Sequence, residues 1–403
     1  MRHFAFLSEE QTSRLFHIRP RTLSPESDPA LLATALGATL YCPADRPQLA
    51  ADIRKQALRG CMSMVLCLED SIADSAVDDA ETNVVQTLSQ LHRRMLTAAS
   101  DSTPDSAQTP LLFIRVRTPE QMVRLAQRCG ESLNVLAGFV APKFENESGI
   151  AQQYMDALHR IHNEHGQGRT SSRRRLRLMP ILESPVMIHA ETRSAALANI
   201  RRVLQANRED ILAVRLGATD MCSAFGLRRT RDLTVYDVSV VASMIGDIVN
   251  LLGRPEDGFV ISGPVWEHYA NTERLLRPLL RATPFAAAED VELRQRLLLG
   301  NLDSLMREIA LDQANGLLGK TVIHPSHVPL VHAMSVISHE EYLDAGEILG
   351  QGDGGAKASP YRNKMNEMKP HQGWAAATAR RAAVFGVAAE NITYVDLLEA
   401  GMS

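Results

Sequence analysis

Short apolar runs of β-prone residues alternate with amphipathic stretches along most of the chain. Runs of this length, bounded by turn-forming residues, indicate strands. Eight predicted strands result, at residues 38–43, 62–68, 111–116, 135–141, 178–182, 211–217, 258–261 and 321–323.

The stretches between these runs carry apolar residues at three- and four-residue spacing, which predicts helices. The clearest cover residues 79–95, 188–204, 236–252 and 302–314. Alternating strands and helices favour a parallel sheet, because parallel neighbours need crossover connections. Eight such units in about 290 residues fit a single (β/α)₈ TIM barrel of the α/β class better than an open sheet.

The predicted organisation has three parts. An N-terminal extension covers residues 1–35, the catalytic barrel residues 36–335, and a C-terminal helical extension or lid residues 336–403. Polar loops at 101–110 and 166–172 and an excursion at 266–319 interrupt the barrel. Residues 350–360 (GQGDGGAKASP) look like a flexible hinge, and an Ala-rich helix is expected near 374–384.

A polar residue follows each predicted strand. In a TIM barrel the strand C-termini open onto one face, where active sites are built. Such side chains therefore converge on one mouth, although a lone charged residue at a strand end is unremarkable. They are Asp45, Arg46, Glu69, Asp70, Arg115, Arg117, Lys143, Glu183, Asp220, Ser262 and His324.

Two of these acids end neighbouring strands and are candidate metal ligands. Glu183 and Asp220 follow the fifth and sixth strands, so their carboxylates could flank one small ion. Two carboxylates with open positions suit Mg²⁺, which prefers oxygen ligands and keeps waters for a substrate to displace. Alternatively, either acid caps the following helix or pairs with an arginine.

The arginines of the mouth are candidate substrate ligands. Arg115 could bind a carboxylate in a bidentate manner and neutralise a developing oxyanion, and Arg46 could bind a second anionic group. Glu69 and Asp70 could hold waters around the metal, orient Arg46, or cap the next helix.

Two lysines leave a different chemistry open. Lys143 or Lys320 could form a Schiff base with a keto substrate. His324 could donate a proton, although a histidine in such a turn is more often structural. The carboxylate pair favours the metal route over the lysines.

Composition removes several other function classes. A net charge of −4 gives no reason to expect a nucleic-acid or membrane partner, and no apolar run is long enough to span a bilayer. The five cysteines have no zinc-like spacing and no signal peptide precedes them, which predicts a protein of the reducing cytoplasm.

At this point the strand-end motifs resemble those of the HpcH/HpaI aldolase family, which includes the citrate lyase β-subunit-like proteins. The resemblance runs in order from about residue 38 to 330, with one motif per strand. The motifs are LYCPADRP (40–47), VLCLEDSI (65–72), FIRVR (113–117), VAPKFE (140–145), PILES (180–184), GATDMCSAFG (217–226), SGP (262–264) and GLLGKTVIHPSHV (316–328).

The resemblance implies a Mg²⁺-dependent carbon–carbon lyase or synthase acting on a 2-oxo or hydroxy carboxylic acid or its thioester. Glu183 and Asp220 would bind the metal, and Arg115 would bind the substrate's carboxylate or keto oxygen. Arg46 would lie near it at the mouth, and Glu69 and Asp70 would surround the metal site. The resemblance also implies a homo-oligomer, a trimer or hexamer.

The chain departs from the family pattern at several positions. Arg117 stands where an Asn is usual, and Ser262 replaces an Asp. The loop after Asp220 carries Arg228, Arg229 and Arg231, which could add affinity for anions. The tail differs from the lid of thioester-cleaving members, which indicates a divergent branch of TIM-barrel C–C bond lyases and makes coenzyme A a doubtful substrate handle. A catalytically silent barrel that binds a ligand or an assembly partner is the alternative from another class.

Overall fold

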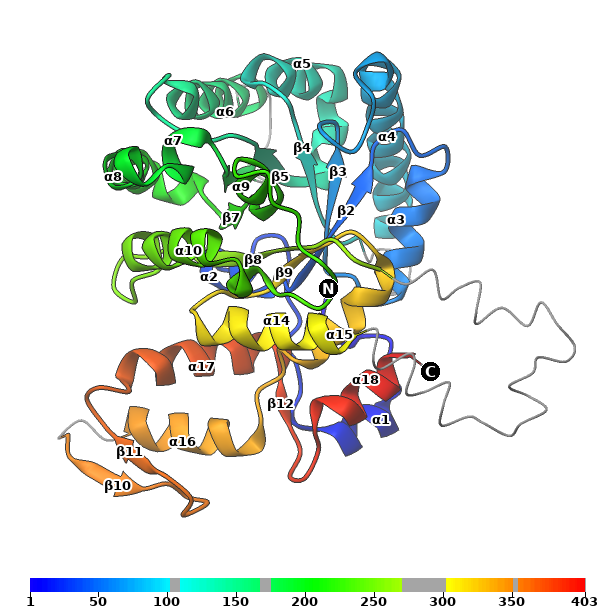
Figure 1. Ribbon diagram of the computed structural model, residues 1–403. Coiled ribbons are helices and arrows are strands. Elements are labelled where there is room, and N and C mark those ends of the chain that lie inside the picture. The colour runs from blue at the N-terminus through cyan, green and yellow to red at the C-terminus, as the bar shows by residue number, and fades with distance from the viewer. Residues whose placement is uncertain (102–108, 167–174, 270–301, 351–353, 403) are drawn as a thin grey trace, which may run out of the picture.

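Eight parallel strands form a closed barrel at the centre of the molecule (Figure 1). The computed structural model describes residues 1–101, 109–166, 175–269, 302–350 and 354–402. Each strand pairs with the next in chain order, and the last pairs with the first, so the predicted (β/α)₈ fold is confirmed. The strands are β2 (Ala38–Pro43), β3 (Ser63–Cys67), β4 (Leu111–Arg115), β5 (Leu136–Ala141), β6 (Arg177–Leu182), β7 (Val214–Leu216), β8 (Ile261–Trp266) and β9 (Lys320–Val322).

Alternate residues of each strand point into the barrel or towards the outer helices. Val65, Phe113 and Met179 belong to the apolar cluster inside the barrel. Leu66 and Ile114, one position further along, belong to the larger cluster between strands and helices. Because the strands share this register, the side chains at their C-terminal ends form the next layer of the interior.

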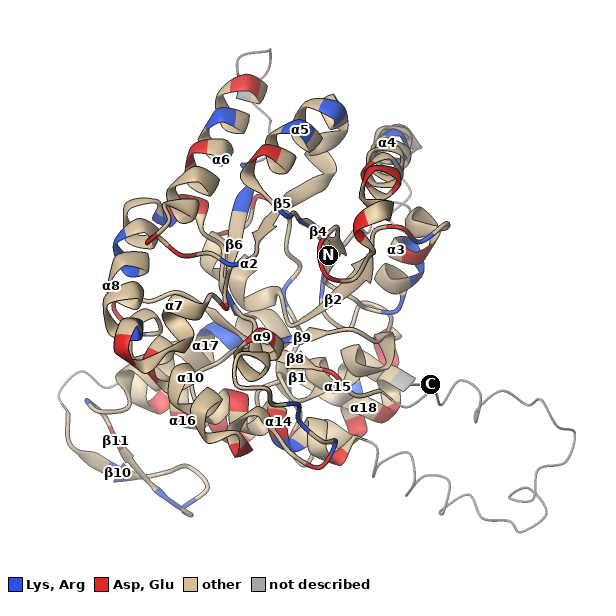
Figure 2. Cartoon of the chain, turned by 45° about the horizontal axis from the view of Figure 1, so that its top comes forward, with Lys and Arg blue, Asp and Glu red and all other residues tan. Residues whose placement is uncertain are grey.

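A ring of helices surrounds the strands. Acidic and basic residues are spread over the outer faces of α5, α6 and α8 (Figure 2), as expected for helices with one buried face. Thr118 caps α5 by accepting from the Gln121 N–H, and Pro119 occupies its first turn. The outer helices are α3 (Leu49–Leu58), α4 (Val77–Asp101), α5 (Pro119–Cys129), α6 (Ile150–Gly166), α8 (Ala190–Ala206), α10 (Ser239–Leu252), α14 (Asp303–Ala314) and α15 (Val328–Ala333).

The two terminal extensions pack against each other beneath the barrel (Figure 1). β1 (Phe16–Ile18) pairs antiparallel with β12 (Val387–Ala388), and α1 (Glu9–Leu15) contacts α18 (Tyr394–Met402). α2 (Pro29–Ala35) contributes Leu32 and Ala33 to the interior cluster and so closes the barrel floor.

The rest of the C-terminal extension is a separate layer (Figure 1). It contains α16 (His339–Gly350), which packs on α17 (Gln372–Phe385), and a hairpin of β10 (Ala356–Ala358) with β11 (Met365–Glu367). The predicted hinge is therefore wrong for residues 356–360, since half of that stretch forms a strand and its turn. The Ala-rich helix is confirmed.

Two strand assignments also need correction. The seventh strand begins at Ile261, where the predicted one ends, because Gly263 and Pro264 read as a turn although the strand runs through them. Lys320 begins β9 instead of lying at the mouth. Most of the predicted loops at 101–110 and 166–172, and 270–301 of the excursion, lie outside the described residues.

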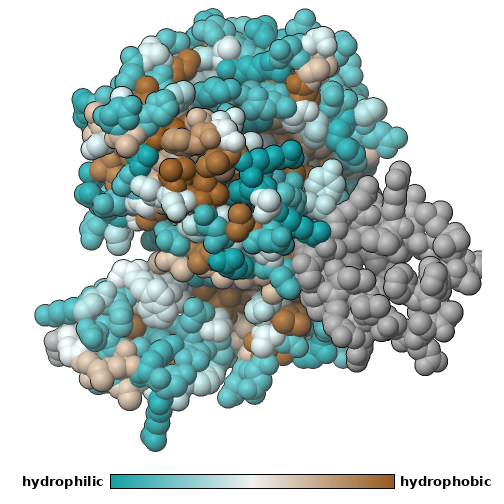
Figure 3. Space-filling view, in the orientation of Figure 1, coloured by the Kyte–Doolittle hydropathy of each residue, from teal (hydrophilic) through white to brown (hydrophobic). Residues whose placement is uncertain are grey.

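The surface seen in Figure 3 is mainly hydrophilic, with hydrophobic residues gathered around α7 (Pro185–Ile188) and α9 (Ala218–Ser223). Phe225 and Leu227, just after α9, are among the exposed apolar side chains. No helix within the described parts of the chain has both the length and the hydrophobicity to cross a membrane.

Candidate active site

Glu69 lies at the centre of the charged residues of the mouth. It follows β3, is only 6% exposed, and accepts hydrogen bonds from two cations. Its Oε2 is 3.0 Å from Arg115 Nη1, and its Oε1 is 2.9 Å from Lys143 Nζ. Burial alone would raise the pKa of Glu69, but Arg115 and Lys143 outweigh it and lower that pKa. Glu69 is therefore an anion that fixes two cations.

Arg115, the last residue of β4, is held on several sides. Its Nε donates to Cys67 Sγ at 3.1 Å, and its guanidinium lies 5.5 Å from the centre of the Tyr41 ring. Its Nη2 makes only a long contact, 4.0 Å, with Asp70 Oδ2. Because burial would lower its pKa and the surrounding sulfur, phenol and Glu69 raise it, Arg115 keeps its charge. Nη2 can thus receive a further oxygen.

Lys143 connects this cation–anion group to the predicted metal ligand. Its φ of 50° is left-handed, a conformation that non-glycine residues adopt rarely and at a cost. This backbone directs its N–H to Glu183 Oε1 at 3.0 Å, while its side chain reaches Glu69. The strained residue therefore orients both carboxylates.

Glu183 and Asp220 lie close enough for their charges to interact. Burial, and then repulsion from Asp220, raises the pKa of Glu183 to about 7. Glu183 is 4% exposed, and Asp220 lies in the first turn of α9. Gly217 leaves room for this arrangement, because a Cβ there would overlap the Glu183 carboxylate.

The Glu183–Asp220 pair fits a hard divalent cation. Neighbouring carboxylates that repel each other become favourable when a cation lies between them, and carboxylate oxygen is what Mg²⁺ prefers. Within the described residues no group of three or more His, Cys, Asp or Glu side chains has metal-binding geometry. An ion here would accordingly keep positions for water and substrate.

A cavity of about 620 Å³ opens beside these groups, lined by Glu69, Asp70, Arg117, Lys143 and Tyr154 among others. It places the mouth residues against a space that can hold a small carboxylic acid. We call Glu69, Asp70, Arg115, Lys143, Glu183 and Asp220 the mouth cluster.

Arg46 does not join the mouth cluster. Its Nε is 2.6 Å from Asp52 Oδ2 in the first turn of α3, and about half of its side chain is exposed. The expectation that Glu69 or Asp70 orients Arg46 is therefore wrong. The nearer carboxylate of Asp52 takes that role.

Lys320 lies in a second, fully buried group of charges. Its Nζ is 2.8 Å from Glu308 Oε1 and 2.7 Å from Asp312 Oδ2, both on α14. Glu308 also pairs with Arg229, and Asp312 accepts from the Tyr236 hydroxyl. We call these five residues the buried cluster.

The buried cluster corrects two expectations. Burial would lower the pKa of Lys320, but Asp312 and Glu308 outweigh it and raise that pKa, so Lys320 is an unreactive, enclosed cation. Arg229 is 5% exposed and donates to the Val265 carbonyl, so it offers nothing to a bound anion. His324 accepts from the Ser326 N–H and so caps the turn that follows it.

Three contributors to the mouth were not identified from the sequence. Cys67 receives the Arg115 Nε–H, and Gly217 makes room for Glu183. Arg117 donates to the Leu68 carbonyl at 2.7 Å and pairs with Asp74, and so fastens the segment that carries Glu69. Only the alternation of inward positions could have indicated Cys67, two residues before Glu69.

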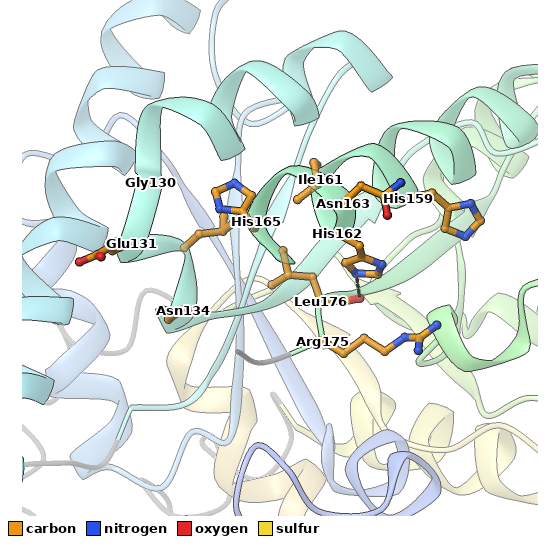
Figure 4. Close-up of a pocket in the computed structure, with 11 residues that line it drawn as sticks. Gly130, Glu131, Asn134, His159, Ile161, His162, Asn163, His165, Arg175 and Leu176 are labelled. Carbon is orange, nitrogen blue, oxygen red and sulfur yellow. Dashed lines mark hydrogen bonds between the residues drawn. The ribbon is translucent and has the colours of Figure 1, made fainter. Parts of the chain in front are cut away.

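A cavity of similar size, about 660 Å³, lies at the opposite end of the strands (Figure 4). His162 and Arg175 line it, together with His159. His162 contacts the Leu176 carbonyl, while Arg175 and His159 contact Asp210. These side chains fasten α6 and residues 208–210 to the barrel, and none belongs to the mouth cluster.

A family model described as C-C bond lyase of the TIM-barrel fold matches residues 30–387. The chain belongs to this family. The resemblance noted from the strand-end motifs is thereby confirmed, including its divergent branch. Comparison with curated protein sequences gives no match.

Solved structures similar to this C–C bond lyase family member share its fold. The protein CitE from Mycobacterium tuberculosis, in complex with magnesium, acetoacetate and coenzyme A, is 19% identical, with 87% of this chain and 99% of that one covered and a TM-score of 0.51. Malate synthase from Haloferax volcanii, in a magnesium/glyoxylate complex, is 15% identical, with 72% of each chain covered and a TM-score of 0.48. RipC from Yersinia pestis is 14% identical, with 75% and 95% covered and a TM-score of 0.44.

Proposed function

We propose that this protein is a Mg²⁺-dependent carbon–carbon lyase of the aldol or Claisen type, acting on a 2-oxo or hydroxy carboxylic acid or its thioester. The observation that carries the proposal is the buried Glu183, whose carboxylate is repelled by Asp220. Such a pair is costly without a cation and favourable with one.

Glu183 and Asp220 would hold the metal. When bound, Mg²⁺ acts as a Lewis acid towards a chelated carbonyl or carboxylate oxygen and favours the enolate formed on bond cleavage. The Lys143 N–H fixes Glu183 in position for this role. The α9 turn supplies Asp220 from the neighbouring strand.

Arg115 would bind the substrate's carboxylate. Its Nε and Nη1 are already engaged by Cys67 and Glu69, which leaves Nη2 directed at the open side. A guanidinium fixed in this way adds directional hydrogen bonds and positive charge where the substrate's oxygens gather.

The Schiff-base route has less support. Lys143 donates to Glu69, which is the largest cause of its raised pKa, whereas an amine nucleophile must be neutral. Lys320 is enclosed in the buried cluster. Borohydride treatment with pyruvate should therefore trap no adduct.

Calorimetric titration with oxaloacetate or pyruvate tests the proposal. Binding is expected with Mg²⁺ and not with EDTA. Glu183→Gln and Asp220→Asn should each lose Mg²⁺-dependent binding while keeping the wild-type fold by circular dichroism. Glu147→Gln, an exposed acid replaced in the same way, is the matched control and should bind like wild type.

Each other outcome has a definite meaning. Binding that ignores EDTA would shift the reaction to Lys143. Wild-type Mg²⁺ affinity in either variant would refute the ligand assignment. No binding of any such acid, with or without Mg²⁺, would favour a silent barrel. The same titration with coenzyme A decides whether a thioester is used, and light scattering tests the trimer or hexamer.

A further inference from the structure

A tyrosine inside the barrel lies between two guanidinium groups. Tyr41 points inward from β2, where its ring packs on the interior apolar cluster. The guanidinium carbon of Arg115 is 5.5 Å from the ring centre, and that of Arg215 is 5.4 Å from it. One cation belongs to the mouth cluster, and the other lies one residue pair deeper on β7.

Arg215 is a buried cation without an anionic partner. It is 1% exposed, and within the described parts of the chain no carboxylate forms an ion pair with it. Its Nη1 and Nη2 donate to the hydroxyls of Thr39 and Thr321, and its Nε has no acceptor. A buried charge left in this state favours the formation of an anion beside it.

The Tyr41 hydroxyl is the group placed to become that anion. It has no hydrogen-bond partner among the described residues, and the side chain is only partly buried. Burial raises its pKa, against which the charges of Arg215 and Arg115 act, while Glu183 raises it further. The phenol is thus protonated at rest and lies within the electrostatic reach of the proposed metal ligand.

We propose that Tyr41 is the proton donor of the reaction, with Arg115 and Arg215 stabilising the phenolate that the transfer leaves. This role rests on the proposed lyase function. After the carbon–carbon bond breaks, its electron pair resides on the carbon next to the substrate carbonyl as an enolate. The Tyr41 O–H bond then breaks, a C–H bond forms at that carbon, and the phenolate regains a proton from water.

The reverse step gives a direct test. A Tyr41 phenolate would remove a proton from the methyl group of pyruvate, so the wild-type protein with Mg²⁺ should exchange those protons for deuterium in D₂O. Proton NMR follows the loss of the methyl signal. Tyr41→Phe keeps the ring and removes the hydroxyl, so exchange should fall about 100-fold, the usual contribution of a positioned acid or base.

Calorimetry separates proton transfer from binding. Tyr41→Phe should bind pyruvate with Mg²⁺ within about threefold of wild type, a change of less than 1 kcal/mol. Tyr394→Phe, the same substitution on α18 at the far end of the molecule, is the matched control and should exchange like wild type.

Three results would overturn the assignment. Wild-type exchange in Tyr41→Phe would show that another group moves the proton. Loss of pyruvate binding in a folded Tyr41→Phe would make Tyr41 a binding residue. If wild-type protein with Mg²⁺ neither binds nor exchanges pyruvate or oxaloacetate, the proposed function falls, and this role with it.

Discussion

The mouth cluster and the buried cluster contain similar residues in opposite states. The buried cluster has two carboxylates, Glu308 and Asp312, and two cations, Arg229 and Lys320, all nearly inaccessible and paired with one another. The mouth cluster has four carboxylates and two cations, and it opens on a cavity. One group is neutral and closed, and the other carries an excess of negative charge.

The difference separates a structural role from a functional one. Charges that satisfy each other inside a protein fix elements in place, here α14 against β9 and the loop that follows Asp220. Charges left unbalanced beside a cavity need an additional partner, which at Glu183 and Asp220 is a cation. Burial alone would not distinguish them, because Glu183 and Glu308 are both buried.

Lys320→Met should give the largest effect on stability. It leaves Glu308 and Asp312 facing each other in the interior with one cation fewer, a change that typically costs about 3–5 kcal/mol. Urea unfolding measures it. Lys357→Met, at an exposed lysine of the β10–β11 hairpin, should change the free energy of unfolding by less than about 0.5 kcal/mol.

A change below about 1 kcal/mol in Lys320→Met would contradict the description of a closed, mutually satisfied group.

The pH dependence of stability sharpens the comparison at Glu183. Its pKa is about 7 in the folded chain and 4.5 ordinarily, so the folded state binds the additional proton between these values. The free energy of unfolding should therefore fall as pH rises through this window, by roughly 3 kcal/mol in EDTA. Glu183→Gln should lack this fall, and unfolding curves at pH 4.5 and 8 measure the difference between the two proteins.

Saturating Mg²⁺ at pH 8 should restore stability to wild type and not to Glu183→Gln. Equal pH dependence in both proteins would mean that Glu183 is not the group that takes up the proton.

The barrel and much of its mouth follow from the sequence because they depend on local patterns. The inward and outward alternation of strand residues and the polar residue at each strand end place Glu69, Arg115, Lys143 and Glu183 correctly. Arg46 was misplaced because strand-end position does not fix where a long side chain points, and Asp52 is its nearer partner.

Contacts between distant segments could not be read in this way. The pairing of Lys320 with Glu308 depends on how α14 packs on β9. The position of Tyr41 between Arg115 and Arg215 joins three separate strands of the closed barrel. The pattern around Gly263 and Pro264 indicated a turn although β8 continues there, because neighbouring strands override local preference.

Gly217→Ala should give the smallest effect on stability and a clear one on the metal site. A Cβ at this position meets the side chain of Glu183, so either the carboxylate or β7 must shift, at about 1–3 kcal/mol. The shift separates Glu183 from Asp220, so Mg²⁺ affinity should fall as well. Gly246→Ala is the matched control, because nothing lies within 4 Å of its added Cβ and α10 tolerates alanine. If Gly217→Ala lost stability but kept wild-type Mg²⁺ affinity, the mouth carboxylates would tolerate displacement. They would then resemble the buried cluster, whose role is structural.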